Sequence, residues 1–196
     1  SAYVLLFLAR KTIRRVVLLG PAHRVPVRGL ALPVAEAFAT PLGGVRIDAE
    51  GAAAALKLPQ VTASDVAHNL EHSLEVQLPF LQTVLDDFTL LPFAVGAATP
   101  TQVAEVLDLL WGGPETLILI SSDLSHFHTY ASAQDIDQGT VGEILALEPS
   151  IEHEQACGAT PMRRRTSGSI GDPRPSRSTV PESGFRRPTA MLIDVV

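Results

Sequence analysis

The chain has 196 residues, of which 46% are hydrophobic and 18% charged, and this composition is typical of a one-domain globular protein. A net charge of −6, with arginines scattered until Arg163, excludes the basic footprint of a nucleic-acid-binding protein. The apolar run over residues 2–9 is far shorter than the ~20 residues of a membrane span, so we expect neither a nucleic-acid nor a membrane partner.

Both the lone cysteine and the first residue bear on where the protein functions. Cys157 cannot form a disulfide within the chain, which favours a reducing, cytoplasmic compartment. The chain opens with Ser1 rather than methionine, and the apolar run after it lacks the basic flank and cleavage site of a signal peptide. We therefore expect the chain to be truncated at its N-terminus.

The first half of the chain is predicted to open with a helix over residues 1–11 and a strand over residues 14–19. This strand is apolar throughout, as expected of a strand buried on both faces. Gly20 and Pro21 end it, which places His23 just past its carboxyl end. Next come a loop or short strand over 25–32, a turn-rich link over 38–44, a weak strand over 45–48 and a helix over 50–58.

Residues 68–85 have helical spacing, because Leu70, Leu74, Leu78 and Leu81 fall on one stripe. Pro79 interrupts the pattern and is expected to kink or end the first part of this helix. His72 and Glu75, three residues apart, would share a helix face. That pair suits a metal ion, and it equally suits a hydrogen bond within a helix pair.

The second half continues the alternation of strands and helices. The expected elements are a strand over 88–95 that includes Pro92, a helix over 100–111 capped by Thr99 or Thr101, a strand over 117–121 and a helix over 132–147. Such alternation predicts an α/β domain, with a layered, mostly parallel central sheet flanked by helices.

A polar run over residues 122–128 follows the strand at 117–121 directly. Ligands of open α/β sheets bind at the carboxyl ends of the strands. Asp123 and His126, three apart at that end, could therefore serve a proton or a metal. In the alternative interpretation Ser122 or Asp123 caps a helix and the histidines are solvated. We expect His68, His128 and His153 to be solvated residues.

Six segments occur in a recognisable order along the chain. They are VVLLGPAH (16–23), TPLGGVRID (40–48), EHSLEVQLPFLQ (71–82), LPFAVG (91–96), ISSDLSHF (120–127) and ACGATPM (156–162). In sequence and spacing they resemble the Memo (mediator of cell motility) family, whose prokaryotic members are often named AmmeMemoRadiSam system protein B. We therefore assign residues 1–162 to a Memo-like domain, incomplete at its start. Residues 163–196, with seven of the 13 arginines, are expected to form a divergent, irregular Arg/Pro/Ser-rich tail.

The resemblance implies the fold of class III extradiol dioxygenases and a metal pocket. It places metal ligands at His23 and Cys157. It places Asp123 and His126 beside the metal, His126 in the position of the dioxygenases' acid/base histidine, and His72 at a further motif position near the pocket. We take these three as the candidate catalytic residues. Imidazole and thiolate together bind Fe(II), Cu or Zn, and we expect Fe(II) or Cu. The alternatives are that His23 merely ends a strand and that Cys157 is a small buried hydrophobe.

Two departures from the family pattern bear on activity. Family members carry a further metal-ligand histidine in an upstream Ala-Pro-His-Ala-Gly-Tyr segment, and this chain begins after that point. From Pro173 onward nothing matches the family, so a fragmentary or frame-disrupted gene would explain both ends. The missing start is also expected to leave the strand at 14–19 as an unpaired edge, which would make the chain only marginally stable unless a partner covers it.

The sequence thus predicts a Memo-like protein with a partial metal pocket. The expected activity, if the chain is an enzyme, is a metal-dependent redox or dioxygenase-like reaction on an unknown small molecule. The alternatives are a non-enzymatic adaptor that holds a peptide or a partner protein at the pocket rim, and an inactive gene fragment. A homo-oligomer is compatible with each of them.

Overall fold

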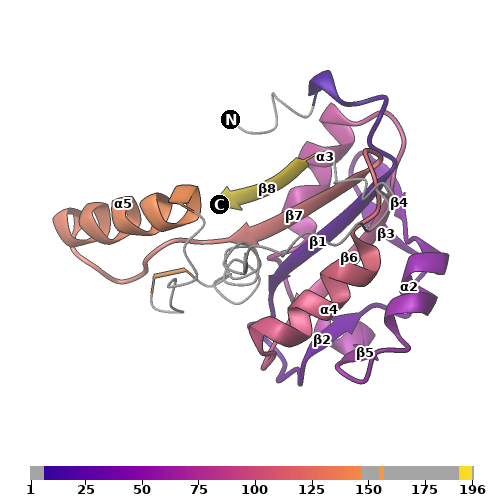
Figure 1. The fold of residues 1–196 in the computed structure, drawn as a ribbon, viewed down its shortest axis with the longest axis horizontal. Helices are drawn as coiled ribbons and strands as arrows, with labels where there is room; N and C mark the ends of the chain where they lie inside the picture. The colour runs from indigo at the N-terminus through magenta and orange to yellow at the C-terminus, as the bar shows by residue number, and fades with distance from the viewer. Residues whose placement is uncertain (1–6, 147–154, 157–189, 196) are drawn as a thin grey trace, which may run out of the picture.

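A six-stranded mixed sheet forms the centre of the protein (Figure 1), in the order β5-β2-β6-β1-β7-β8. The structure is a computed structural model, and it describes residues 7–146, 155–156 and 190–195. The strands of this sheet are β1 (Arg15–Pro21), β2 (Leu30–Leu32), β5 (Val61–Ala63), β6 (Thr89–Val95), β7 (Thr116–Ser122) and β8 (Ala190–Val195). Among the described residues, only β2 and β6 are antiparallel neighbours in this sheet. The predicted α/β class is therefore confirmed, with a mixed sheet in which most neighbours are parallel.

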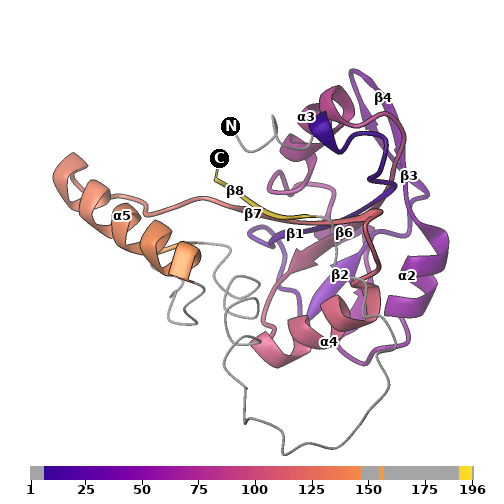
Figure 2. The same ribbon diagram turned by 45° about the horizontal axis from the view of Figure 1, so that its top comes forward.

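A separate hairpin and a set of helices complete the described fold. The hairpin consists of β3 (Ala37–Thr40) and β4 (Gly43–Arg46). The helical elements are α2 (Ala49–Ala55), the 3-10 turns η1 (Asp65–Ala67) and η2 (Glu75–Gln77), α3 (Leu78–Val84), α4 (Pro100–Leu110) and α5 (Tyr130–Ala146). In Figures 1 and 2, α3 and α4 lie on opposite faces of the sheet, and α5 projects away from it. Among the described residues, no helix combines the length and apolar character that crossing a bilayer requires.

The strand β1 lies inside the sheet, and the expectation of an unpaired edge at this strand is wrong. It pairs in parallel with β6 on one side and with β7 on the other. Its side chains alternate between two cores: Val16 and Leu18 pack in the cluster that includes α3, and Val17 and Leu19 pack in the cluster that includes α4. All four are fully buried. The predicted marginal stability therefore loses its basis, because that argument rested on an exposed β1.

Pro92 lies within β6 without interrupting it. A proline cannot donate a ladder hydrogen bond and is tolerated where no partner needs one. On the side away from β1, the neighbour β2 pairs with β6 only at Ala94 and Val95. The strand predicted over 88–95 is thus confirmed, as are the strand over 117–121 and the helix over 132–147, with small shifts of their ends.

The predicted helix over 68–85 is wrong in its first half. Helical structure begins with η2 at Glu75, and the α-helix α3 starts only at Leu78, with Pro79 in its first turn. Proline suits the first helical turn, where its missing N–H group has no partner to lose. Leu74, Leu78 and Leu81 are buried as the stripe predicts, whereas Leu70 is 67% exposed because the chain does not continue the helix back to it.

Three other segments differ from their predictions. The turn-rich link over 38–44 belongs to the β3–β4 hairpin, whose turn is held by the Thr40 hydroxyl donating to the Gly43 carbonyl at 3.0 Å. The segment 25–32 ends in the short strand β2, one of its two predicted alternatives. Residues 190–195, included above in the irregular tail, form β8 beside β7, while residues 163–189 and 196 lie outside the described residues. Of the helix predicted over 1–11, residues 7 and 8 are helical and residues 1–6 are outside that description.

The capping of α4 follows its local sequence. Thr99 accepts a hydrogen bond from the Gln102 backbone N–H, and the Gln102 side chain accepts one from the Thr99 N–H. This reciprocal pair satisfies two donors that a helix start otherwise leaves unpaired. Thr99 is therefore the N-cap, one of the two predicted caps.

Candidate functional site

A pocket of about 260 Å³ lies where the carboxyl ends of the neighbouring strands β1 and β7 meet. Its walls come from three segments that are distant in the sequence: the end of β1, the turn before η2, and the end of β7. The lining residues are Pro21, His23, Arg24, Glu71, His72, Ser73, Val76, Ser121, Ser122 and Asp123. Parallel strands carry their polar continuations to the same sheet edge, which is where open α/β sheets bind ligands.

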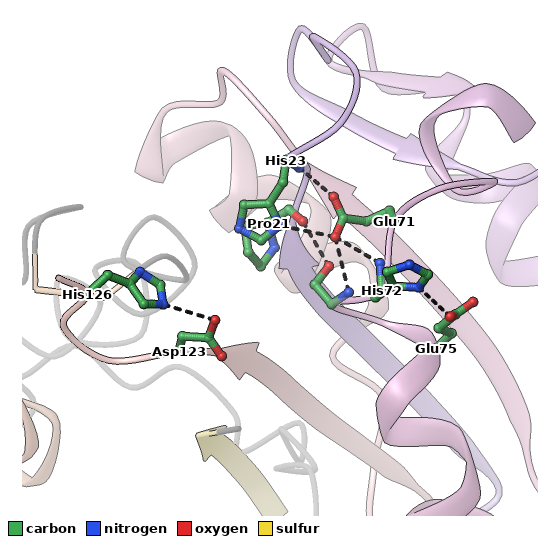
Figure 3. Close-up of polar contacts among 8 residues, drawn as sticks. Pro21, His23, Glu71, His72, Glu75, Asp123 and His126 are labelled. Carbon is green, nitrogen blue, oxygen red and sulfur yellow. Dashed lines mark hydrogen bonds and ion pairs between the residues drawn. The ribbon is translucent and has the colours of Figure 1, made fainter.

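The carboxylate of Glu71 connects the β1 end to the turn before η2 (Figure 3). It accepts hydrogen bonds from the His23 backbone N–H and, at 3.1 Å, from the His23 ring atom Nδ1. It also accepts the backbone N–H groups of His72 at 3.0 Å and Ser73 at 3.1 Å. The Ser73 hydroxyl then donates to the Pro21 carbonyl at 2.8 Å. Because the Glu71 carboxylate accepts the N–H groups that follow it, residues 71–73 do not form a helix.

These hydrogen bonds set the charge of Glu71. Burial, the largest single effect, would raise the pKa of this carboxyl group. The hydrogen bonds from the His23 backbone, the His23 ring and the Ser73 backbone outweigh it and lower the pKa of Glu71 from 4.5 to about 2. Glu71 is therefore an ionised carboxylate at neutral pH although its side chain is only 4% exposed.

The charge on Glu71 fixes the orientation of the His23 ring. An ionised carboxylate can only accept hydrogen bonds, so the Nδ1 atom that contacts it must carry the proton. In the neutral ring the other nitrogen, Nε2, then has a free lone pair. Since 48% of the His23 side chain is exposed and the residue lines the pocket, this imidazole can bind a metal ion or accept a proton.

Two further acid–imidazole pairs accompany His23 and Glu71 (Figure 3). Asp123 Oδ2 lies 3.2 Å from His126 Nε2, just past the end of β7, and His72 Nδ1 contacts Glu75 Oε1. Asp123 and His72 line the pocket, whereas His126 reaches it only through Asp123. The His126 and His72 side chains are 52% and 63% exposed, so solvent reaches both imidazoles.

A buried amide ties η2 to the β7 end. Gln77 is 1% exposed, and its Nε2 donates to the Ser121 hydroxyl at 3.0 Å. A buried polar side chain of this kind costs free energy unless it is hydrogen-bonded, so the bond fixes the distance between these two walls. Hydrogen bonds to Glu71 therefore hold the pocket walls together on one side, and the hydrogen bond from Gln77 holds them together on the other.

Comparison with known proteins shows which family the chain is related to. Residues 1–162 match the sequence model of a family described as "Memo-like protein". The chain belongs to the Memo family. Similar proteins include MEMO1 family proteins of Archaeoglobus fulgidus (35% identical over 70% of this chain and 54% of that protein), Aquifex aeolicus (38% over 75% and 59%) and Methanosarcina mazei (33% over 78% and 61%). This Memo-family chain thus spans between half and two thirds of the length of these curated relatives.

Of the site residues predicted from the Memo resemblance, the structure brings His23, His72 and Asp123 to one pocket, with His126 beside it. Cys157 lies outside the described residues. Within the described part of the chain, no group of three or more histidine, cysteine, aspartate and glutamate side chains is arranged as a metal-ligand set. The predicted ligand roles of His23 and Cys157 therefore remain predictions.

One histidine predicted to be solvated is buried in this Memo-family chain. His68 is 8% exposed; its Nε2 lies 3.1 Å from the Ala31 carbonyl oxygen, and its ring meets the edge of Phe38. Burial lowers the pKa of His68, although the Ala31 contact and the charges of Asp65 and Glu71 act in the opposite direction. The prediction failed because the β3–β4 hairpin covers this ring. His128 is exposed as predicted, and His153 is not among the described residues.

The residue that sequence reasoning missed is Glu71. It is adjacent to His72 in the segment that resembles the Memo family, and a glutamate beside a candidate histidine could have been noted there. Its partner His23 is 48 positions away, however, and no local pattern indicates that the two meet. Only the tertiary structure assigns Glu71 its position.

Proposed function

We propose that the pocket of this Memo-family chain binds a divalent or redox-active metal, Fe(II) or Cu, with His23 and Cys157 as ligands. The observation that carries this proposal is the Glu71–His23 pair at the pocket wall. Histidines that bind metals commonly donate their second ring N–H to a carboxylate, which fixes the ring and makes the ligating nitrogen more basic. The Glu71–His23 pair at this pocket has that arrangement.

The donor chemistry of the described residues fits a metal in part. His23 offers one nitrogen, and Asp123 offers a carboxylate oxygen in the same pocket, but the ligand set is not complete among the described residues. A sulfur from Cys157 would complete a mixed imidazole–thiolate set of the type that Fe(II), Cu or Zn accepts. When bound, such a metal supplies Lewis acidity and, for Fe or Cu, redox chemistry.

The side chains around the pocket support a reaction on a small molecule. The imidazole of His126 is exposed at the pocket edge, and Asp123 orients its ring through the 3.2 Å contact. Ser121 and Ser122 place hydroxyl groups on the same wall as Asp123. We assign His126 and Asp123 to proton transfer, with His72 as a further polar wall, in a redox or dioxygenase-like reaction.

The test is the metal content of purified protein, compared between wild type, His23→Ala and Cys157→Ala after equilibration with Fe(II) or Cu. We expect both variants to lose most of the bound metal, and Glu71→Gln to bind it about 10-fold to 100-fold more weakly. His128→Ala is the matched control, because His128 is exposed and does not line the pocket. Unchanged metal content in both ligand variants would refute the proposal.

A second function, the binding of a peptide or partner protein at the pocket rim, is favoured by one observation. Phe127 directly follows His126, and its side chain is completely exposed at a backbone φ of 61°. A non-glycine residue on a left-handed backbone is uncommon, and an aromatic side chain that is exposed beside the pocket offers a large contact area to a partner. If the chain is such an adaptor, added Fe(II) and catechol-type substrates should give no oxygen consumption, and Phe127→Ala should weaken capture of the partner more than His23→Ala does.

A further inference from the structure

Arg24 brings to the pocket a positive charge that has no acidic partner among the described residues. Arg24 follows His23 directly, is exposed and contributes to the pocket wall. Within the part of the chain that the structure describes, its guanidinium forms no ion pair, and the other lining residues include no lysine or arginine. By contrast, Arg15 is paired with Asp48 at 2.6 Å and Arg10 with Asp86 at 3.5 Å.

The acidic residues of the pocket have other partners. Glu71 accepts hydrogen bonds from His23, His72 and Ser73, which occupy both of its oxygens. Asp123 contacts the ring of His126 at 3.2 Å. The guanidinium of Arg24 is thus a donor group at the pocket surface that these carboxylates leave available.

We propose that Arg24 binds the carboxylate of a small, singly charged organic acid, which is the substrate or ligand of this pocket. The inference rests on the proposed function only in taking this pocket as the binding site for a small molecule. A guanidinium presents parallel N–H donors that match the two oxygens of a carboxylate, and such charge-assisted pairs are about twice as strong as neutral hydrogen bonds. Arg24 would therefore orient the acid, with the remainder of the molecule towards His23 and the serine hydroxyls.

The charges of the pocket favour one negative charge over two. Two carboxylates, Glu71 and Asp123, line the same pocket, and that of Glu71 accepts four hydrogen bonds from N–H groups. These two carboxylates repel an anion and only one guanidinium attracts it, so a doubly charged phosphate monoester is disfavoured relative to a carboxylate.

The size and lining of the pocket define the rest of the ligand. A volume of about 260 Å³ is just below the range of small-molecule sites, which excludes a large ligand from full burial. Pro21 and Val76 contribute apolar surface, and Val76 is 37% exposed. An aromatic or short aliphatic acid is small enough for this volume and has an apolar part that can contact Pro21 and Val76.

Benzoate and its neutral analogue benzamide form a matched pair of probes, because they differ mainly in the charge of one group. Binding to the metal-free chain of residues 1–196 is measured by ligand-observed NMR or calorimetry. We expect benzoate to bind with a dissociation constant on the order of 1 mM and benzamide at least about 10-fold more weakly. Phenyl phosphate is expected to bind more weakly than benzoate.

Substitutions then locate the binding site. Arg24→Gln should weaken benzoate binding by about 10-fold or more, and Arg24→Lys should restore only part of it. Arg28→Gln is the control, because it removes the same charge from an exposed position of the same segment that does not line the pocket. Equal binding of benzoate and benzamide, or equal effects of Arg24→Gln and Arg28→Gln, would overturn the inference. Binding of phenyl phosphate at least as tight as benzoate would overturn the preference for a single charge.

This test is separable from the test of metal binding. Arg24→Gln should retain the wild-type metal content, and benzoate binding is measured on the metal-free chain, so it does not depend on the metal. If benzoate and benzamide bind equally while the metal-content test gives the expected result, the carboxylate inference alone is refuted. If His23→Ala and Cys157→Ala keep the wild-type metal content while Arg24→Gln still weakens benzoate binding, the metal proposal alone is refuted.

Discussion

Replacement of Glu71 by glutamine should destabilise the chain at neutral pH and remove a defined part of its pH dependence. Glutamine has nearly the same size, but it carries no charge, and one of its two terminal groups is a donor. It cannot accept all four hydrogen bonds that His23, His72 and Ser73 give to the carboxylate. The substitution therefore tests the electrostatic role of Glu71 at almost constant volume.

The magnitude follows from the pKa. Folding lowers the pKa of Glu71 from 4.5 to about 2, and each pKa unit corresponds to about 1.4 kcal/mol. The ionised carboxylate thus adds about 3 kcal/mol to the free energy of unfolding at pH 7. Between these two pKa values the unfolded chain binds the proton and the folded chain does not. The contribution is consequently complete above about pH 5, falls to about 1 kcal/mol at pH 3, and is lost as the pH passes below about 2.

Urea denaturation of wild type and Glu71→Gln at several pH values from 7 to 3 measures this contribution. We expect the difference in unfolding free energy to be about 3 kcal/mol at pH 7 and to shrink steadily below pH 4.5. The matched control is Glu75→Gln, which also removes a carboxylate from a histidine, His72, but at a half-exposed site. Its effect should be much smaller, because exposed ion pairs contribute little.

Two results would refute this reasoning. Equal stability of wild type and Glu71→Gln at pH 7 would mean that the carboxylate is not held by its hydrogen bonds. A difference that stays constant from pH 7 to pH 3 would mean that the loss comes from packing and not from charge.

Three further predictions concern other parts of the fold. Thr99→Ala should lower the free energy of unfolding by about 1 kcal/mol in urea denaturation, because α4 loses the capping box with Gln102; an unchanged midpoint would contradict this. Gly29→Ala should destabilise strongly or prevent folding, since Gly29 has φ +82° and an added Cβ would lie 2.1 Å from the Gln60 carbonyl oxygen; a wild-type melting temperature would disprove the clash. His68→Gln should flatten the stability profile between pH 7 and 5, because burial lowers the pKa of His68, so the wild type loses stability as the pH falls below 6.5; an unchanged slope would exclude His68 as its source.

The local parts of the fold could be predicted from the sequence because their signals lie within a few residues. The apolar run before Gly20 identifies β1, and the threonines beside Pro100 indicate the start of α4, with Thr99 or Thr101 as its cap. The leucine stripe correctly places Leu74, Leu78 and Leu81 in the core. The stripe wrongly predicts a helix at residues 68–74, because the Glu71 carboxylate there competes with helix formation for backbone N–H groups.

The candidate site, too, could be predicted from the sequence only in part. That His23 and Asp123 follow the carboxyl ends of strands is visible in the sequence, and the alternation of strands and helices indicates that those ends can meet. The sequence predicted no role for Glu71, Gln77 or Arg24. The contribution of each depends on pocket residues that come from a distant segment of the chain.

The sequence by itself determined the α/β class, most of the elements and the Memo family, since these depend on apolar periodicity, turn residues and short motifs. Only the tertiary structure decided that β1 lies inside the sheet, that His68 is buried and that Glu71 holds His23. The physical reason is that strand order, burial and ionisation depend on contacts between residues far apart in the chain, which no local pattern specifies.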